Sequence, residues 1–144
     1  MPRTNGATSS PETYKALIAL DGRLGKSLGH VLYDLVKLRA SQINGCAFCV
    51  DMHSVDLEKR GVPTRTIYGV AAWEESPFFD ETQRVGLAFA ERLTGGIDAV
   101  DDALWDEAGR LLGEERRTDL LIAVGTINTW NMLGITTHLH PATS

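Results

Sequence analysis

The chain has 144 residues, of which 43% are hydrophobic and 23% are charged, and its formal net charge at pH 7 is -5. This composition excludes an intrinsically disordered chain and is typical of a folded globular protein. The length favours one domain, residues 1–144, which can bury roughly 70% of the surface of its unfolded form and therefore needs no disulfide or metal to fold. The acidic balance and the scattered basic residues argue against a nucleic-acid partner.

The N-terminal segment is polar, and about residues 1–10 are a candidate for disorder. It lacks the apolar core of a secretory signal. The most apolar stretch, residues 120–135, is shorter than the roughly 20 residues of a membrane span. We therefore expect a cytoplasmic protein without a membrane partner. In that reducing compartment, two closely spaced cysteines are more often catalytic or metal-binding than a permanent crosslink.

Apolar residues recur at helical spacing along the chain, and signals for strands are nearly absent. The predicted helices span residues 11–20, 28–44, 46–61, 63–71, 80–93, 101–112 and 114–133. Gly22 and Gly25 are expected to end the first helix, and Asp80 with Gln83 resembles a capping pair. Because the connections are short, the predicted fold is an all-α, single-domain antiparallel helical bundle.

The last predicted helix, residues 114–133, is apolar almost all round. Such a helix is expected to be covered on every side, either at the centre of the domain or against another subunit. Asn128 and Asn131 interrupt its apolar surface, and buried amides need partners. We expect these two residues to form structural hydrogen bonds.

Both cysteines of the chain lie in SQINGCAFCVDMHS, residues 41–54. Cys46 and Cys49 are three positions apart, and His53 follows Cys49 by four, so the three side chains share one face of a helix. Cys46 falls in the first turn, where unpaired N–H groups and the helix dipole favour a thiolate. His53 can exchange a proton with Cys49, and the spacing of the two sulfurs allows a disulfide across one turn.

This pattern is compatible with reduction of a peroxide in two steps. A thiolate attacks the O–O bond and becomes a sulfenic acid, and the second thiol then condenses with it to form a disulfide and release water. A dithiol from elsewhere must reopen the disulfide by exchange.

The segment DLVKLRASQINGCAFCVDMHS resembles the core motif of the carboxymuconolactone decarboxylase superfamily, on its alkylhydroperoxidase D-like branch. The similarity extends to AAWEESPFFDETQRVGLAFAERLT and LIAVGTINTWNMLG. The resemblance implies an alkylhydroperoxidase D-like fold and a thiol-dependent peroxidase of peroxiredoxin-type, antioxidant activity, which reduces hydroperoxides or exchanges disulfides. It also implies a homo-oligomer, a trimer or a hexamer.

In the family, an acidic residue twelve positions before the first cysteine joins the cysteines and the histidine in a proton relay. The resemblance therefore assigns the catalytic roles to Cys46, Cys49, His53 and Asp34. In peroxidase members the second cysteine attacks; the helix dipole favours Cys46, whereas proximity to His53 favours Cys49. We assign the attack to Cys49.

Two positions depart from the family pattern. The relay acid is typically Glu, and Asp34 reaches about 1.5 Å less far, so a water is expected to bridge the gap. A histidine precedes the second cysteine in a peroxidase member, where this chain has Phe48. These departures put strong peroxidase activity in doubt. His30, four residues before Asp34, shares its helical face and is a candidate to tune it.

The resemblance implies no metal, flavin or haem cofactor. The expected partners are a hydroperoxide substrate and a dithiol reductant, such as a lipoyl protein or a thioredoxin-like protein.

Four alternatives remain open. The cysteines could be small core residues, or they could bind zinc with His53 and a carboxylate from Asp34 or Asp51. The protein could be a lyase acting on a lactone acid, as the superfamily name suggests, although decarboxylase members generally do not depend on a cysteine pair. It could also be a non-enzymatic redox sensor or oligomeric scaffold. His138 and His140 are expected to be partly exposed residues at a helix end.

Overall fold

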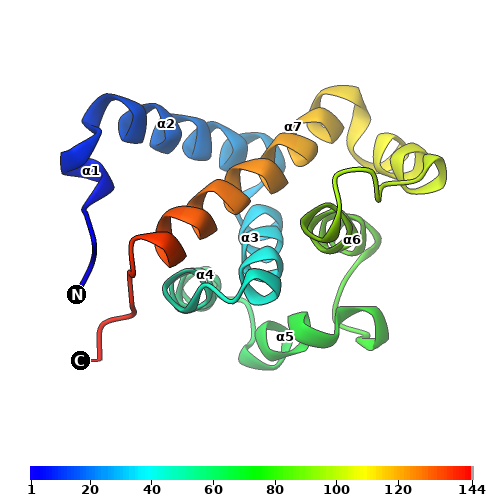
Figure 1. The fold of residues 1–144 in the computed structure, drawn as a ribbon. Coiled ribbons are helices and arrows are strands. Elements are labelled where there is room, and N and C mark those ends of the chain that lie inside the picture. The colour runs from blue at the N-terminus through cyan, green and yellow to red at the C-terminus, as the bar shows by residue number, and fades with distance from the viewer. Residues whose placement is uncertain (144) are drawn as a thin grey trace.

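The computed structural model describes residues 1–143, and every regular element in that range is a helix (Figure 1). In chain order the elements are α1 (Gly6–Ser9), α2 (Pro11–Leu28), α3 (His30–Asn44), α4 (Ala47–Lys59), α5 (Thr64–Gly69), the 3₁₀ helix η1 (Val70–Glu75), α6 (Glu81–Gly95) and α7 (Asp102–Thr136). The predicted all-α fold is confirmed.

Helix α3 lies in the middle of the bundle and packs against α4, α6 and α7 (Figure 1). Its two sides contribute to two clusters of buried apolar side chains. Val36 belongs to a cluster that α3 shares with α2, α6 and α7, and Leu35 and Leu38 belong to another that it shares with α4, α5, η1 and α6. A helix buried on both sides is a fixed platform for the polar residues that it carries.

Several predicted boundaries agree with the structure. Helix α3 is followed by Gly45 at φ 74°, a left-handed conformation that a residue with a side chain rarely adopts. Asp80 and Gln83 form the expected capping box at the start of α6. Helix α7 bends sharply at Gly113, where φ is 82° and ψ is 172°, so the predicted helices 101–112 and 114–133 are its two halves.

The predicted end of the first helix was wrong, because α2 continues through Gly22 and Gly25 to Leu28. Burial of Leu24 and Leu28 holds the extra turns in place. A Cβ at Gly25 would come within 2.8 Å of the His30 ring, so this glycine serves close packing where α2 meets α3. The short helix α1 was not predicted; the Asn5 side chain caps it by accepting a hydrogen bond from the Ala7 N–H.

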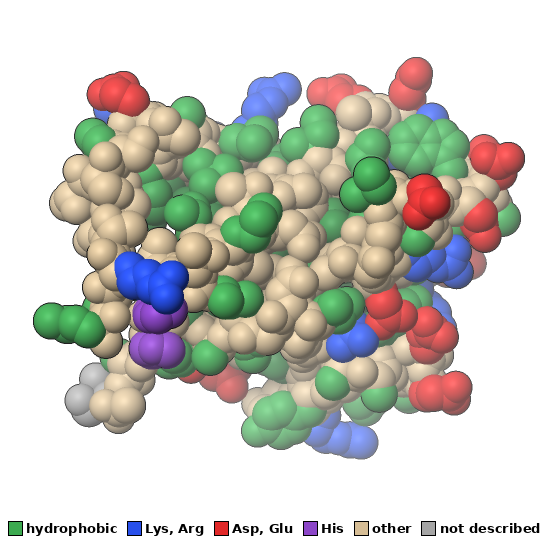
Figure 2. All heavy atoms as spheres, viewed as in Figure 1, with side chains coloured by type: hydrophobic (Ala, Val, Ile, Leu, Met, Phe, Trp, Pro, Cys, Tyr) green, Lys and Arg blue, Asp and Glu red, His purple; other side chains and the backbone are tan. Residues whose placement is uncertain are grey.

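Of the two expected arrangements of the last helix, a central position covered on every side is not found within this chain, and cover by another subunit stays a prediction. Four large apolar side chains of α7 are exposed: Leu121, Ile122, Met132 and Ile135. In Figure 2, few charged side chains lie over the middle of the face that α7 crosses in Figure 1. Among the residues described, no helix combines the length and the apolar character that crossing a membrane requires.

Candidate active site

The two cysteines are joined in a disulfide at the start of α4. Gly45 turns the chain away from α3, and Cys46 takes the N-cap position of α4, where its sulfur accepts a hydrogen bond from the Cys49 N–H at 3.3 Å. The Cα atoms of Cys46 and Cys49 are 5.2 Å apart, within the usual range for a disulfide. Both side chains are buried. In this state the sulfurs offer no thiolate to zinc.

Helix α7 passes directly over the disulfide at Gly134. A Cβ at this position would lie 2.8 Å from the sulfur of Cys46 and 3.4 Å from that of Cys49. Contacts below 3.0 Å do not occur without a shift of one of the groups. The absence of a side chain at Gly134 therefore lets α7 cover the sulfurs.

An amide clamp, formed by Ser41, Asn44, Asn128 and Asn131, fixes α7 against the end of α3. The Asn44 amide donates to the side-chain oxygens of Asn128 and Asn131, at 2.8 and 3.0 Å. The Asn131 amide donates to the Ser41 hydroxyl at 2.9 Å, and that hydroxyl donates to the Lys37 carbonyl at 2.7 Å. The predicted structural role of the two α7 asparagines is confirmed.

Cys49 lies in the wall of a cavity of about 480 Å³ between α4, α7 and the two ends of the chain. Tyr14, Phe48, Trp130 and Leu133 supply much of its apolar wall, and the rings of Tyr14 and Trp130 meet edge to face with centroids 5.4 Å apart. The cavity is within the size range of sites for small organic molecules. Phe48 makes the wall beside the disulfide apolar, as expected from the sequence.

His53 also lines this cavity, one helical turn beyond Cys49, and only 3% of its surface is exposed. Neither ring nitrogen has a hydrogen-bond partner among the described residues. Burial, and then the positive charge of Lys37, lower the pKa of His53 to about 3. The ring is therefore neutral at physiological pH, and its nitrogen without a hydrogen can accept a hydrogen bond from a group in the cavity.

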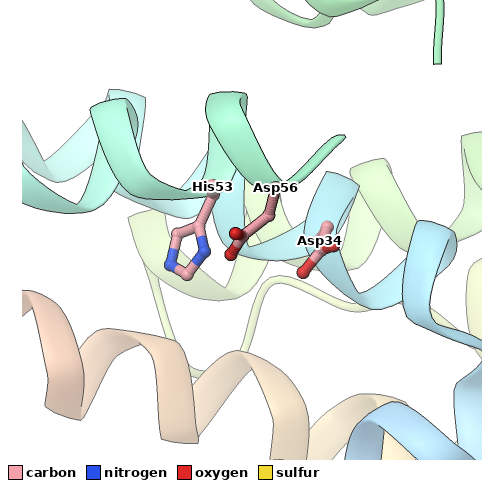
Figure 3. A group of neighbouring side chains, drawn as sticks. All are labelled: Asp34, His53 and Asp56. Carbon is pink, nitrogen blue, oxygen red and sulfur yellow. The ribbon is translucent and has the colours of Figure 1, made fainter. Parts of the chain in front are cut away.

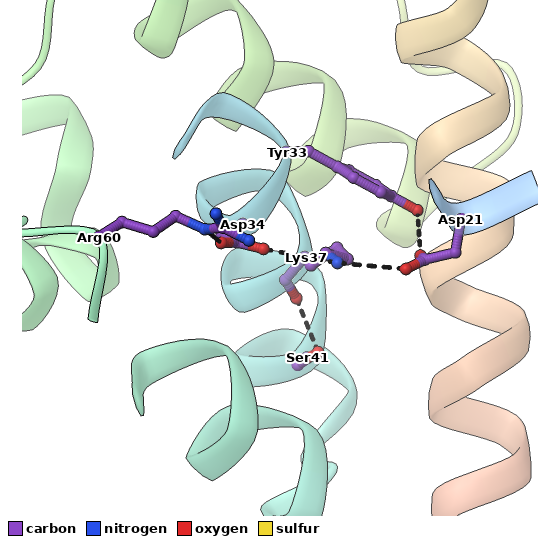
Figure 4. A network of polar contacts seen from close by, with 6 residues as sticks. All are labelled: Asp21, Tyr33, Asp34, Lys37, Ser41 and Arg60. Atoms are coloured by element: carbon purple, nitrogen blue, oxygen red, sulfur yellow. Dashed lines mark hydrogen bonds and ion pairs between the residues drawn. The ribbon is translucent and has the colours of Figure 1, made fainter. Parts of the chain in front are cut away.

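Asp34 belongs to a charged network of alternating sign with Asp21, Lys37 and Arg60 (Figure 4). The Lys37 ammonium lies 3.5 Å from Asp34 and 3.6 Å from Asp21, and it also sits over the Tyr33 ring. Arg60 Nε donates to the second oxygen of Asp34 at 2.5 Å. Burial and the neighbouring Asp21 raise the pKa of Tyr33, so its hydroxyl stays protonated and donates to Asp21. Lys37 and Asp21 both reach the large cavity.

Asp34, His53 and Asp56 each place one polar atom within 4.8 Å of the others, and Asp56 lies beside His53 on α4 (Figure 3). Asp34 and His53 share no direct hydrogen bond, so a proton passing between them needs a bridging group. The three residues could in principle bind a metal ion. The positive charges of Lys37 and Arg60 on Asp34 oppose a cation there.

Four residues near the site were not singled out from the sequence: Asp21, Lys37, Asp56 and Arg60. Spacing could have found two of them, because Lys37 follows Asp34 by three and Asp56 follows His53 by three. His30 is exposed and is not part of the charged network described above. Asp51, one of the ligands considered for zinc, is exposed on the opposite side of α4, and His138 and His140 are exposed as expected.

A model of the carboxymuconolactone decarboxylase family matches residues 11–92, more than half of the chain. The chain belongs to the carboxymuconolactone decarboxylase family. It is 33% identical over 128 residues to YdfG of Bacillus subtilis, an uncharacterized protein, and the match covers 88% of this chain and 87% of YdfG.

A solved structure at 35% identity places this member of the carboxymuconolactone decarboxylase family on the alkylhydroperoxidase D-like branch. A protein of unknown function from Agrobacterium tumefaciens, described as a candidate antioxidant defence protein AhpD, is 35% identical with a TM-score of 0.89, and the match covers 99% of each chain. The debrominase Bmp8, in complex with 2,3,4-tribromopyrrole, is 18% identical with a TM-score of 0.81, over 94% of this chain and 73% of that one. This second likeness shows the fold alone.

Proposed function

We propose that this protein is a thiol-dependent peroxidase that reduces organic hydroperoxides through the Cys46–Cys49 dithiol and disulfide. The main support is that the disulfide borders a large cavity at Cys49, beside a buried histidine whose ring nitrogens have no hydrogen-bond partner within residues 1–143. A buried polar group without a partner is costly in a folded protein. Its retention here supports a role in binding or proton transfer.

In the proposed reaction, the Cys49 thiol donates a hydrogen bond to neutral His53 and gives up its proton through this ring only as the sulfur attacks the terminal oxygen of the hydroperoxide. An S–O bond forms, the O–O bond breaks, and His53 passes the thiol proton to the leaving oxygen, which departs as an alcohol. The Cys46 sulfur then attacks the sulfenic acid, forming the disulfide and releasing water. The two electrons gained by the peroxide are those lost by the two thiols.

The charged network supports this assignment. The Lys37 ammonium lines the cavity and favours negative charge on a thiolate or alkoxide within it. Asp34 holds Lys37 in place and, with Asp56, stands close enough to His53 to exchange its proton through a bridging water. Asp34 thus acts in the proton relay that the family resemblance assigns to it.

The size of the cavity supports an organic substrate. A volume of about 480 Å³ exceeds what hydrogen peroxide needs, and the Tyr14, Trp130 and Leu133 side chains offer apolar contacts. We propose that hydroperoxides with an alkyl or aryl group react faster than hydrogen peroxide. The physiological partners are then a hydroperoxide and a dithiol reductant, and a cytoplasmic location, which stays a prediction, would supply the latter.

Steady-state turnover tests the function. Purified protein, supplied with cumene hydroperoxide and excess dithiothreitol, is expected to form cumyl alcohol catalytically, and the Cys46→Ser and Cys49→Ser variants are expected to lose this turnover. Loss of thiols to peroxide without re-reduction by any dithiol would instead identify a redox sensor. Turnover of a carboxymuconolactone that survives replacement of both cysteines would identify a lyase.

The homo-oligomer, a trimer or hexamer, stays a prediction from the family resemblance. The exposed apolar side chains of α7 agree with a contact between copies. Light scattering coupled to gel filtration measures the assembly directly.

A further inference from the structure

The two sulfurs of the disulfide border two different cavities. Cys49 lines the cavity of about 480 Å³, and Cys46 does not. Cys46 lines a second, smaller hollow of about 150 Å³, and Cys49 does not. Gly134 and Leu139 line both and so form the wall between them. A small molecule therefore reaches Cys49 from the large cavity and Cys46 from the small hollow.

The small hollow lies where the start of α4 meets the C-terminal end of α7. Ala47 and Ile135 line it together with His138 and His140, and all four side chains are exposed. Figure 2 shows two histidine side chains side by side at the edge of the molecule, beside a basic side chain. Imidazole rings can accept a proton from an incoming thiol, which must become a thiolate to react.

The hollow is too small for an organic hydroperoxide of the size that the large cavity admits. About 150 Å³ is roughly a third of the volume beside Cys49, and it suits an unbranched chain that ends in a sulfur atom. Thiol–disulfide exchange requires the incoming sulfur to approach roughly in line with the S–S bond, from the side away from the leaving sulfur. A thiol that attacks Cys46 must therefore come from the side of Cys46 remote from Cys49.

We propose that the small hollow is the entry site of the reducing thiol and that Cys46 is the sulfur it attacks. This inference rests on the proposed function for its physiological meaning. The incoming thiolate forms a bond to the Cys46 sulfur, the Cys46–Cys49 bond breaks, and its electron pair leaves on Cys49 as a thiolate. The second thiol of the reductant then attacks the reductant's own sulfur in the mixed disulfide and releases reduced Cys46, so the reductant leaves as a disulfide.

The surroundings of Cys49 suit the leaving role. Cys49 is the third residue of α4, within the first turn, where the helix dipole favours negative charge. It faces the cavity that the Lys37 ammonium lines. Thiols that are more stable as thiolates leave faster in exchange reactions. Reduction through Cys46 also returns Cys49 directly to the form that attacks the next peroxide.

Two variants on the same helix separate the two approaches. Ala47→Trp fills the small hollow, and Met52→Trp narrows the large cavity, because each residue is exposed and lines only one of the two. Each half-reaction is followed by thiol counting after rapid alkylation: oxidation of reduced protein by cumene hydroperoxide, and reduction of oxidised protein by dithiothreitol. We expect Ala47→Trp to slow only reduction, by tenfold or more, and Met52→Trp to slow mainly oxidation. Equal slowing of both steps, or unchanged reduction in Ala47→Trp, overturns the proposal.

A second measurement uses the wild-type protein and needs no variant to fold. Oxidised protein is mixed with 2-mercaptoethanol, an unbranched thiol, quenched with iodoacetamide and mapped by mass spectrometry. The mercaptoethanol adduct is expected on Cys46 and the alkyl group on Cys49; the reverse pattern overturns the assignment. Because no peroxide is used, this experiment succeeds or fails independently of the peroxidase activity, whose own failure would appear as absent oxidation by hydroperoxides.

Discussion

Two polar networks lie near the disulfide, and they differ in charge and in the completeness of their hydrogen bonding. The amide clamp is neutral, and the side chains of Ser41, Asn44, Asn128 and Asn131 are joined to one another and to the backbone. The charged network, in contrast, lies beside His53, whose ring has no hydrogen-bond partner in the part of the chain that the structure describes. The clamp therefore holds the sulfurs under α7, whereas the charged side has a hydrogen-bonding group available for chemistry.

His53→Gln tests the charged side and has the largest expected effect. The glutamine amide cannot accept and return a proton as the imidazole does, so the rate of thiol oxidation by cumene hydroperoxide is expected to fall at least about 100-fold. The free energy of unfolding should change by no more than about 1 kcal/mol, since the ring makes no hydrogen bond that the substitution removes. Stopped-flow oxidation and urea unfolding measure the two quantities.

His30→Gln is the matched control for this variant, because His30 is exposed and makes no contact with the disulfide cavity. Its oxidation rate should equal that of the wild type. An oxidation rate in His53→Gln within threefold of the wild type would remove His53 from the mechanism.

Asn131→Leu tests the clamp and, in contrast to His53→Gln, is expected to lower stability while leaving the oxidation rate nearly unchanged. It removes the hydrogen bonds to Ser41 and Asn44 and should lower the free energy of unfolding by about 2 kcal/mol. In the fraction that remains folded, the rate of thiol oxidation by cumene hydroperoxide should stay within threefold of the wild-type rate. Glu115→Ala, at an exposed position of the same helix outside its exposed apolar side chains, should leave stability nearly unchanged. If Asn131→Leu reduced the rate 100-fold at unchanged stability, the two networks would not have the separate roles assigned here.

The pKa of His53 predicts a further difference between the two networks. The folded protein holds this pKa at about 3, whereas an unfolded histidine titrates near 6.5. As the pH falls from about 6.5 towards 3, the unfolded chain binds the proton first, so the free energy of unfolding decreases by up to about 1.4 kcal/mol per pH unit. Above pH 6.5 this contribution is constant.

Urea unfolding at pH 7, 6, 5 and 4 measures this loss, and His53→Gln should lose less stability on acidification than the wild type. The clamp has no titrating group, so the free energy of unfolding of Asn131→Leu should fall with pH at the same rate as that of the wild type. Parallel curves for wild type and His53→Gln would mean that the buried ring titrates normally.

Arg60→Gln has the smallest expected effect. Arg60 pairs with Asp34, but 38% of its side chain is exposed, and Lys37 still neutralises the carboxylate when Arg60 is replaced. We expect a change of less than about 1 kcal/mol in unfolding free energy and less than threefold in oxidation rate. A loss comparable to that of His53→Gln would show that Arg60, and not Lys37, controls the charge of Asp34.

Local spacing predicted much of the arrangement around the sulfurs. The three- and four-residue intervals placed Cys46, Cys49 and His53 on one helical face, and the boundary between the predicted helices 28–44 and 46–61 correctly marked the turn at Gly45. These features depend on residues within one or two helical turns of each other. Such short-range geometry is the same wherever the helix lies.

Contacts between distant parts of the chain could not be predicted in the same way. Asp21 reaches Lys37 only because α2 continues past two glycines, and burial of Leu24 and Leu28 decides that continuation. The position of Gly134 over the disulfide depends on how α7 packs across α3 and α4. Helix propensity and periodicity contain no information on these crossings, and the all-round apolar pattern of α7 did not reveal which of its sides would remain exposed.

The most direct test of the account counts thiols in a single turnover. Fully reduced protein is mixed with one equivalent of cumene hydroperoxide, and free thiols are followed by rapid quench in the wild type, Cys46→Ser and Cys49→Ser. We expect the loss of two thiols per peroxide in the wild type, a trapped sulfenic acid on Cys49 in Cys46→Ser, and no fast reaction in Cys49→Ser. Wild-type thiols that disappear no faster than those of a free cysteine peptide would contradict it.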